Sequence, residues 1–233
     1  MEVEKPEEAK IIAFLLTDGG ITKTHFNRPK SWRLHFTSKE EFLLDEFKRN
    51  IQALFGKQTF WESYPKRGKS VYLNSSEIAE YFFRYSPTYR TKQCNSFPSC
   101  PKLRGQKYGP CKECNPIKFK RLHYPPIEVP KLDQGMKEVF LKYYFSVEGS
   151  VTDRIQISQR HPTLLSQIQN LLTELKVETT LNCYSVKGGR YEWYLRVRKK
   201  DMKKFHAQID FLPVQITGSK LTKQKKLNDL VRA

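Results

Sequence analysis

The hydrophobic and polar positions of the chain form two matching series. Residues 11–16 are all apolar, and Asp18 with two glycines follows them. Residues 140–149, with the sequence FLKYYFSVEG, repeat this pattern and place Glu148 before Gly149. Each run is long enough for a helix, and a glycine after the last polar residue is typical of a helix end in the left-handed conformation. The pattern therefore predicts two buried helices that each end in one carboxylate.

The rest of the first half alternates between strand-like and helix-like patterns. Residues 31–37 alternate apolar with basic or polar side chains, which predicts a strand with one core face. Apolar residues recur at helical spacing over 44–54, a hairpin turn is expected around 66–69, and 77–84 is a short amphipathic helix. Residues 1–85 are thus predicted to form helix, two strands, helix, two strands, helix.

The second half, residues 133–233, repeats this order. Alternation over 151–158 and 177–198 predicts strands, with Asp153 and Cys183 on the inward side. The helices are expected at 162–175, 201–209 and 222–231, the last one basic and packed on the surface. The matching order of elements indicates a structural duplication.

Charge changes the picture from an ordinary globular protein to one that binds a polyanion. The chain has 42 Lys and Arg residues against 24 Asp and Glu residues, a formal net charge of +18. With 13% aromatic residues, many of them beside the bases, nucleic acid is a better partner than a membrane surface. A ribosome-like or simply lysine-rich protein is the alternative. No apolar run is long enough to span a membrane and no signal peptide is recognisable, so we expect a cytoplasmic protein.

Residues 86–132 fit neither half and form a proline-rich linker that contains four of the five cysteines. Cys94, Cys100, Cys111 and Cys114 have the spacing C-x5-C-x10-C-x2-C, in which only the last pair has zinc-knuckle spacing. A structural Zn²⁺ in a linker too poor in apolar residues to fold alone is the favoured interpretation. Disulfides are the alternative if the source is a thermophile.

The two acid-ended helices, each followed by strand, strand, helix, strand, strand, helix, resemble the LAGLIDADG homing endonucleases. The first motif reads IIAFLLTDG and the second LKYYFSVEG, in which Lys142, Tyr143 and Tyr144 replace the usual small or aliphatic residues. The resemblance covers roughly residues 7–85 and 133–215. It implies an α+β fold of duplicated αββαββα half-domains related by pseudo-twofold symmetry. The antiparallel sheets of this monomer would form a DNA-binding saddle, and the two motif helices would pack at the axis.

The resemblance also implies a metal-dependent site. Asp18 and Glu148 would lie side by side, and two carboxylates so placed need a counter-ion. Mg²⁺ or a similar divalent cation suits such oxygen donors, with the backbone carbonyls of Thr17 and Val147 as further ligands. The implied activity is hydrolysis of both strands of a long DNA target, leaving short 3′ overhangs, by a protein encoded in a mobile intron or intervening sequence. Each acid alone could instead be an ordinary helix-end residue.

Further residues would surround the attacking water. Gln159 aligns with a family glutamine after the second strand, and Ser38 holds the corresponding place in the first half. Lys200 aligns with a family lysine near the scissile phosphate, and Lys39 and Arg160 are neighbours that could substitute for it. Each of these could also be a solvated charge or a phosphate contact.

The outward faces of the eight strands are expected to follow the major groove, where Arg and Lys pair with guanine and Gln or Asn with adenine. The candidates are Lys23, His25, Arg28, Arg33, His35, Arg67, Lys69, Tyr72, Arg154, Gln156, Asn182, Tyr184, Lys187, Arg190, Tyr194, Arg196 and Arg198. A non-enzyme of the same fold, an RNA-splicing maturase or a DNA-binding regulator, is the second interpretation of the whole chain.

Overall fold

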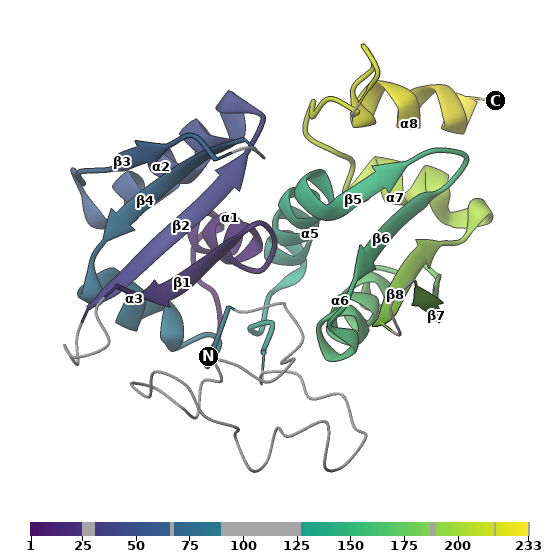
Figure 1. Cartoon of the computed structure of the whole chain (residues 1–233). Coiled ribbons are helices and arrows are strands. Elements are labelled where there is room, and N and C mark those ends of the chain that lie inside the picture. The colour runs from purple at the N-terminus through teal and green to yellow at the C-terminus, as the bar shows by residue number, and fades with distance from the viewer. Residues whose placement is uncertain (25–30, 66–67, 90–126, 187–189, 217, 233) are drawn as a thin grey trace.

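The protein consists of two half-domains with the same order of elements (Figure 1). Its computed structural model describes residues 1–24, 31–65, 68–89, 127–186, 190–216 and 218–232. The first half contains α1 (Pro6–Leu15), β1 (Gly19–Lys23), β2 (Trp32–Ser38), α2 (Glu41–Phe55), β3 (Trp61–Ser63), β4 (Lys69–Asn74) and α3 (Ser76–Phe83). The second contains α5 (Gln134–Glu148), β5 (Gly149–Val151), β6 (Ile155–Gln159), α6 (Pro162–Glu174), β7 (Thr179–Val186), β8 (Arg190–Val197), η2 (Lys199–Asp201), α7 (Met202–Gln208) and α8 (Lys223–Arg232).

The two sheets confirm the predicted duplication. Each has four antiparallel strands, in the orders β1-β2-β4-β3 and β5-β6-β8-β7. The second order is the first one repeated, strand for strand. Figure 1 shows α1 and α5 next to each other between the two sheets, as the α+β prediction requires.

The seam between α1 and α5 is built from aromatic rings. Phe14 of α1 is fully buried and meets the Tyr143 ring of α5 edge-on, with ring centroids 5.4 Å apart. The Tyr143 hydroxyl donates to Glu46 Oε2 of α2 at 2.7 Å. Tyr144 is fully buried and stacks on Phe140. Tyr143 therefore contacts α1 across the seam, whereas the rings that Tyr144 meets belong to α5 itself.

The start of α1 follows the sequence signals. Pro6 occupies the first turn, where its missing N–H costs nothing. The carboxylate of Glu8, itself buried, accepts from the backbone N–H groups of Glu4 at 3.0 Å and Lys5 at 3.1 Å and from the Tyr81 hydroxyl. These bonds satisfy donors that a helix N-terminus leaves unpaired.

The reason for the glycines after the two acids differs from our prediction. We expected a left-handed helix end, but Gly149 is extended, with φ −73° and ψ 153°, and Gly19 already lies in β1. The glycines are needed for space. A Cβ on Gly19 would lie 2.5 Å from Phe14 O and 2.9 Å from His35 O, and one on Gly149 would lie 2.5 Å from Phe145 O.

We expect Gly19→Ala to destabilise the fold by about 1–3 kcal/mol, because both clashing atoms belong to the backbone and the first strand must shift. Urea unfolding measures the loss. Gly135→Ala is the matched control in α5, since its Cβ would meet only Asp133 Oδ1, at 3.6 Å, and alanine favours the helix. Equal stability of Gly19→Ala and the unsubstituted protein would contradict this explanation.

Two residues predicted from alternation to be inward and buried are exposed. The segment 151–158 is not one strand: β5 ends at Val151, a bend follows, and Asp153 is exposed in it. Cys183 is also exposed, because β7 is the edge strand of its sheet.

The predicted linker can be compared only with the elements on either side of it. α3 ends at Phe83 and α5 begins at Gln134, while the Gln167 side chain of α6 bonds to the backbones of Ile127 and Val129. The domain boundaries at 85/86 and 132/133 stay a prediction. Cys94, Cys100, Cys111 and Cys114 lie outside the described residues, so zinc and disulfides there remain untested predictions. None of the described helices has the length and apolar character needed to cross a membrane.

Candidate active site

Two carboxylates lie where the central helices end. Asp18 follows α1 in an exposed turn, and its carbonyl accepts from Thr37 N at 3.3 Å. Glu148 is the last residue of α5 and is half-buried. Burial and the neighbouring charge of Asp18 raise the pKa of Glu148 to about 8, although Lys223 and a hydrogen bond with Gln159 act in the opposite direction. The charges of the two acids thus interact where the ends of α1 and α5 meet.

Gln159 lies at this point, as predicted from the resemblance. It ends β6, is buried, and its side chain bonds to Glu148. Strand register explains its place: Gly149 pairs with Ile157, so Gln159 extends two residues further toward Glu148. In the first half Gly19 pairs with Phe36, so Ser38 has the same relation to Asp18.

Lys223 is a member of the site that sequence reasoning missed. It is the first residue of α8 and only 8% exposed. Burial lowers its pKa to about 8, while the carboxylates of Glu148, Asp18 and Glu40 act in the opposite direction. We predicted a basic surface helix, which holds for most of α8. One signal was present: Lys223 lies four residues before the fully buried Leu227, on the apolar side of the helix.

The donor atoms at this point fit a hard divalent cation. The carboxylates of Asp18 and Glu148 are joined by the carbonyls of Thr17 and Val147 at the negative ends of two helices. Among the residues that the structure describes, no three His, Cys, Asp or Glu side chains converge on a metal position. A cation here would therefore take its other ligands from backbone, water and substrate oxygens, which is a common arrangement for Mg²⁺.

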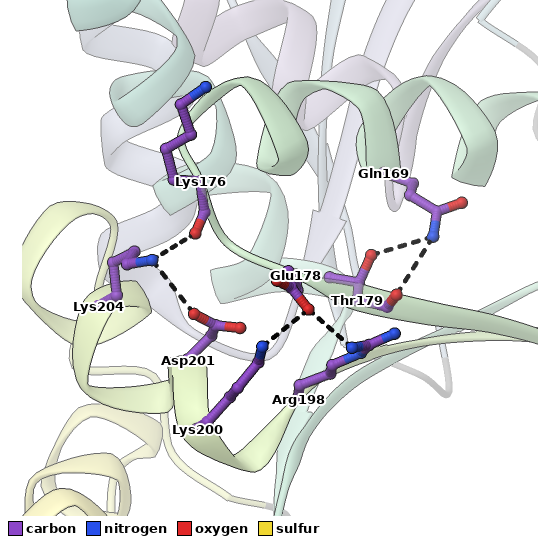
Figure 2. Close-up of polar contacts among 8 residues, drawn as sticks. All are labelled: Gln169, Lys176, Glu178, Thr179, Arg198, Lys200, Asp201 and Lys204. Carbon is purple, nitrogen blue, oxygen red and sulfur yellow. Dashed lines mark hydrogen bonds and ion pairs between the residues drawn. The ribbon is translucent and has the colours of Figure 1, made fainter.

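Lys200 is not part of this site, contrary to our prediction. Figure 2 shows its ammonium next to Glu178, at 3.1 Å, together with Arg198, whose Nη1 lies 2.7 Å from the same carboxylate. β8 runs antiparallel to β6 and pairs Trp193 with Gln159 and Arg196 with Gln156. Lys200 follows the end of β8, so it lies beyond the Gln156 end of the sheet, more than about 10 Å along the strand from Gln159.

Lys39 and Arg160 lie at the ends of the two strands that lead to the acids. Lys39 follows Ser38 at the end of β2 and is exposed; Arg160 follows Gln159 at the end of β6 and is partly exposed. Both are thus next in sequence to residues beside the acids. Their roles remain predictions.

On the face of the first sheet that the helices leave open, one arginine packs against a stacked pair of aromatic rings. The Arg33 guanidinium lies 4.5 Å from the Trp61 ring centroid and 5.3 Å from that of Tyr72, and its Nε donates to Asn74 Oδ1 at 3.0 Å. Trp61 and Tyr72 stack on each other at 4.2 Å, and His35 stacks on Tyr72 at 6.2 Å. We call Arg33, Trp61, Tyr72 and Asn74 the first arginine cluster. Trp61 was missed, because a three-residue strand shows little periodicity.

The open face of the second sheet carries a similar group. The Arg196 guanidinium lies 5.5 Å from the Tyr184 ring and 5.4 Å from the Tyr194 ring, and its Nε donates to Gln156 Oε1 at 3.2 Å. We call Arg196, Tyr184, Tyr194 and Gln156 the second arginine cluster. Asn182 pairs with Tyr194 on the same face and is exposed.

Two predicted DNA contacts are placed differently. Lys23 pairs with Trp32 and so faces the helix side with Leu34. Lys69 shares the face of Val71 and binds Glu41 at 2.6 Å and Glu62 at 2.9 Å. Both errors arose because basic residues near a strand end were assigned to the open face, although the alternation along the strand puts them on the face that the helices cover. Arg154 and Arg198 are exposed and pair with Asp153 and Glu178, and their contacts with DNA stay predictions.

The remaining predicted contacts lie outside the described part of the chain or of its side chains: His25, Arg28, Arg67, Lys187 and the side chain of Arg190. They stay predictions.

Comparison with known proteins agrees with this architecture. Residues 136–210 match the family described as the LAGLIDADG-like domain. By sequence, the chain has no significant match among curated proteins. The match runs from α5 to the residues after α7, within the second half.

Solved structures extend the likeness to both halves. Mesophilic variants of the homing endonuclease I-DmoI align with a TM-score of 0.60 and 17% identity over 88% of this chain and 94% of that chain. I-DmoI in complex with DNA and Mn aligns with 0.59 and 18% over 88% and 96%. The meganuclease I-SmaMI bound to uncleaveable DNA aligns with 0.52 and 13% over 100% and 89%. Other I-DmoI structures contain DNA and Ca or were determined in the presence of Mg. At these identities the likeness establishes the fold, so the predicted LAGLIDADG architecture is confirmed.

Proposed function

We propose that this chain, which has the two-motif LAGLIDADG fold, is a monomeric, site-specific endonuclease that cuts both strands of DNA with a divalent cation at Asp18 and Glu148. The observation that carries the proposal is that α1 and α5 pack against each other and each delivers one carboxylate at its end, where the charges of Asp18 and Glu148 interact. Two acids so close repel each other unless a cation or a proton lies between them.

The residues of the site have distinct roles in this proposal. When bound, a divalent cation supplies an activated water and neutralises charge on the leaving oxygen. Asp18 and Glu148 hold it, one from each half, and Gln159 fixes the Glu148 carboxylate through its hydrogen bond. Lys39 and Arg160, next to this point, position the phosphates on either side of the cut.

The open faces of the two sheets supply DNA recognition. Counterion release by a chain of net charge +18 gives affinity without sequence preference. Arg33 and Arg196 have their guanidinium groups fixed by aromatic rings and by one amide each, so little freedom is lost when they pair with guanine. The two arginine clusters therefore account for sequence preference in the two halves of a long target.

We expect Arg33→Ala to weaken binding to the preferred target by about 1–3 kcal/mol and to relax the preference at one position of the site. Selection from a randomised target library, followed by titration, measures both effects. Arg49→Ala is the control, since Arg49 lies on α2, is largely exposed and pairs with Glu46. An unchanged position preference in Arg33→Ala would rule out base reading by the first arginine cluster.

The test of the function uses supercoiled DNA that carries the uninterrupted insertion site of the gene, incubated with the protein and Mg²⁺. The proposal predicts linear DNA with short 3′ overhangs, as expected for a protein of mobile intron or intervening-sequence origin. Binding without cleavage would favour the second interpretation, a maturase or a DNA-binding regulator.

A further inference from the structure

The ammonium of Lys223 occupies the end of the central helix α5. Its Nζ donates to Ser146 O at 2.6 Å and to Val147 O at 3.3 Å. These carbonyls belong to the last turn of α5, directly before Glu148, where the helix dipole is negative. Val147 O is one of the oxygens that fit a divalent cation. Lys223 thus occupies a carbonyl oxygen that a cation at this site would also use as a ligand.

The surroundings of this ammonium are acidic from both halves of the protein. Glu148 and Asp18 attract it from the ends of α5 and α1, and Glu40 attracts it from the loop before α2. A positive charge here does what a bound cation would do, because it reduces the repulsion between the two carboxylates. The site is therefore already supplied with a counter-ion by the chain itself.

The position of Lys223 is fixed by the C-terminal segment that carries it, which we take from Leu212 to the end of α8. Leu212 N donates to Ser146 Oγ at 2.8 Å, and Gln215 N donates to Glu40 Oε1 at 3.3 Å, so this segment touches both halves. Gln224 Nε2 donates to Asp210 Oδ2 at 2.8 Å, and Leu227 is fully buried. α8 also packs against β5 and α7 (Figure 1). Lys223 is therefore held at the site by packing around it.

We propose that Lys223 is a resident counter-ion of the Asp18–Glu148 pair that competes with the divalent cation, so that the cation binds as the ammonium leaves Val147 O. This inference rests on the proposed function, since it takes the acid pair as the cation site. A divalent cation held by Val147 O would be repelled by an ammonium on the same carbonyl. The C-terminal segment thereby sets the cation concentration at which the site fills.

The test is calorimetric titration of the full chain with Ca²⁺, without DNA, for the unsubstituted protein and Lys223→Met. Methionine keeps the long stem and removes the charge. We expect Lys223→Met to bind Ca²⁺ at least about tenfold more tightly. We also expect it to melt at a lower temperature without Ca²⁺ and to gain more in melting temperature when Ca²⁺ is added. Lys223→Gln, a smaller neutral side chain, repeats the test if Lys223→Met is poorly folded.

Lys225→Met is the matched control, because Lys225 lies on the same helix and is exposed. It should bind Ca²⁺ like the unsubstituted protein. Equal or weaker Ca²⁺ binding by Lys223→Met would overturn the inference and make Lys223 a structural or supporting residue. That result leaves the endonuclease proposal intact if the target is still cleaved. Absence of Ca²⁺ binding in every variant would also overturn the inference, and the cleavage test would then decide the function separately.

Discussion

Asp18→Asn and Glu148→Gln are each expected to slow DNA cleavage by about a thousandfold or more while binding of the target persists. Each substitution keeps the size of the side chain and removes one of the two charges that hold the cation. A metal contributes several kcal/mol to stabilising charge in the transition state, and each 1.4 kcal/mol is a factor of ten in rate. Target affinity should stay or rise slightly, since a negative charge is lost near the phosphates.

Single-turnover cleavage with excess protein separates this effect from binding. Glu138→Gln is the control: it removes one negative charge from α5, ten residues away from the site. Its cleavage rate should match that of the unsubstituted protein. Normal cleavage by Asp18→Asn would show that the acid pair does not carry the chemistry.

Phe14→Ala is expected to lower the free energy of unfolding by about 3–5 kcal/mol, the largest stability effect that we predict. Phe14 is fully buried and contacts rings from both halves: Phe36 at 4.5 Å, Phe47 at 5.9 Å and Tyr143 at 5.4 Å. Removing its ring leaves a cavity beneath the helix ends that carry the acids. Little room exists for collapse, because α1 is buried on nearly all sides.

Chemical denaturation of Phe14→Ala and Phe14→Leu measures this effect. Leucine fills more of the space, so its loss should be less than half as large. A loss below about 1.5 kcal/mol for Phe14→Ala would mean that the seam tolerates a cavity and that the halves are held together elsewhere.

The sequence was sufficient for the order of the elements and for the two acids. Helical and strand periods are set by which side chains face the core, and the duplicated order made each half a check on the other. Gln159 could be placed because it aligns with a glutamine of the resembled family after the second strand, and the strand register then puts it beside Glu148. Such features depend on local spacing, which a sequence records directly.

Features that depend on packing between distant segments were missed or misplaced. Gly19 is required by the close approach of Phe14 O and His35 O, not by its backbone angles. Lys200 follows β8, which ends at the end of the sheet opposite Gln159, and there Lys200 pairs with Glu178. Lys223 reaches the site from a helix 75 residues after Glu148, and one lysine among many on a basic helix gives no sign of burial beyond its spacing to Leu227.

The most direct test of the central claim is anomalous X-ray scattering from crystals of the protein with its target DNA and Mn²⁺. We expect a Mn²⁺ peak within coordination distance of both the Asp18 and the Glu148 carboxylates, adjacent to a DNA phosphate. Carboxylates turned to separate surfaces, with no peak between them, would contradict the claim.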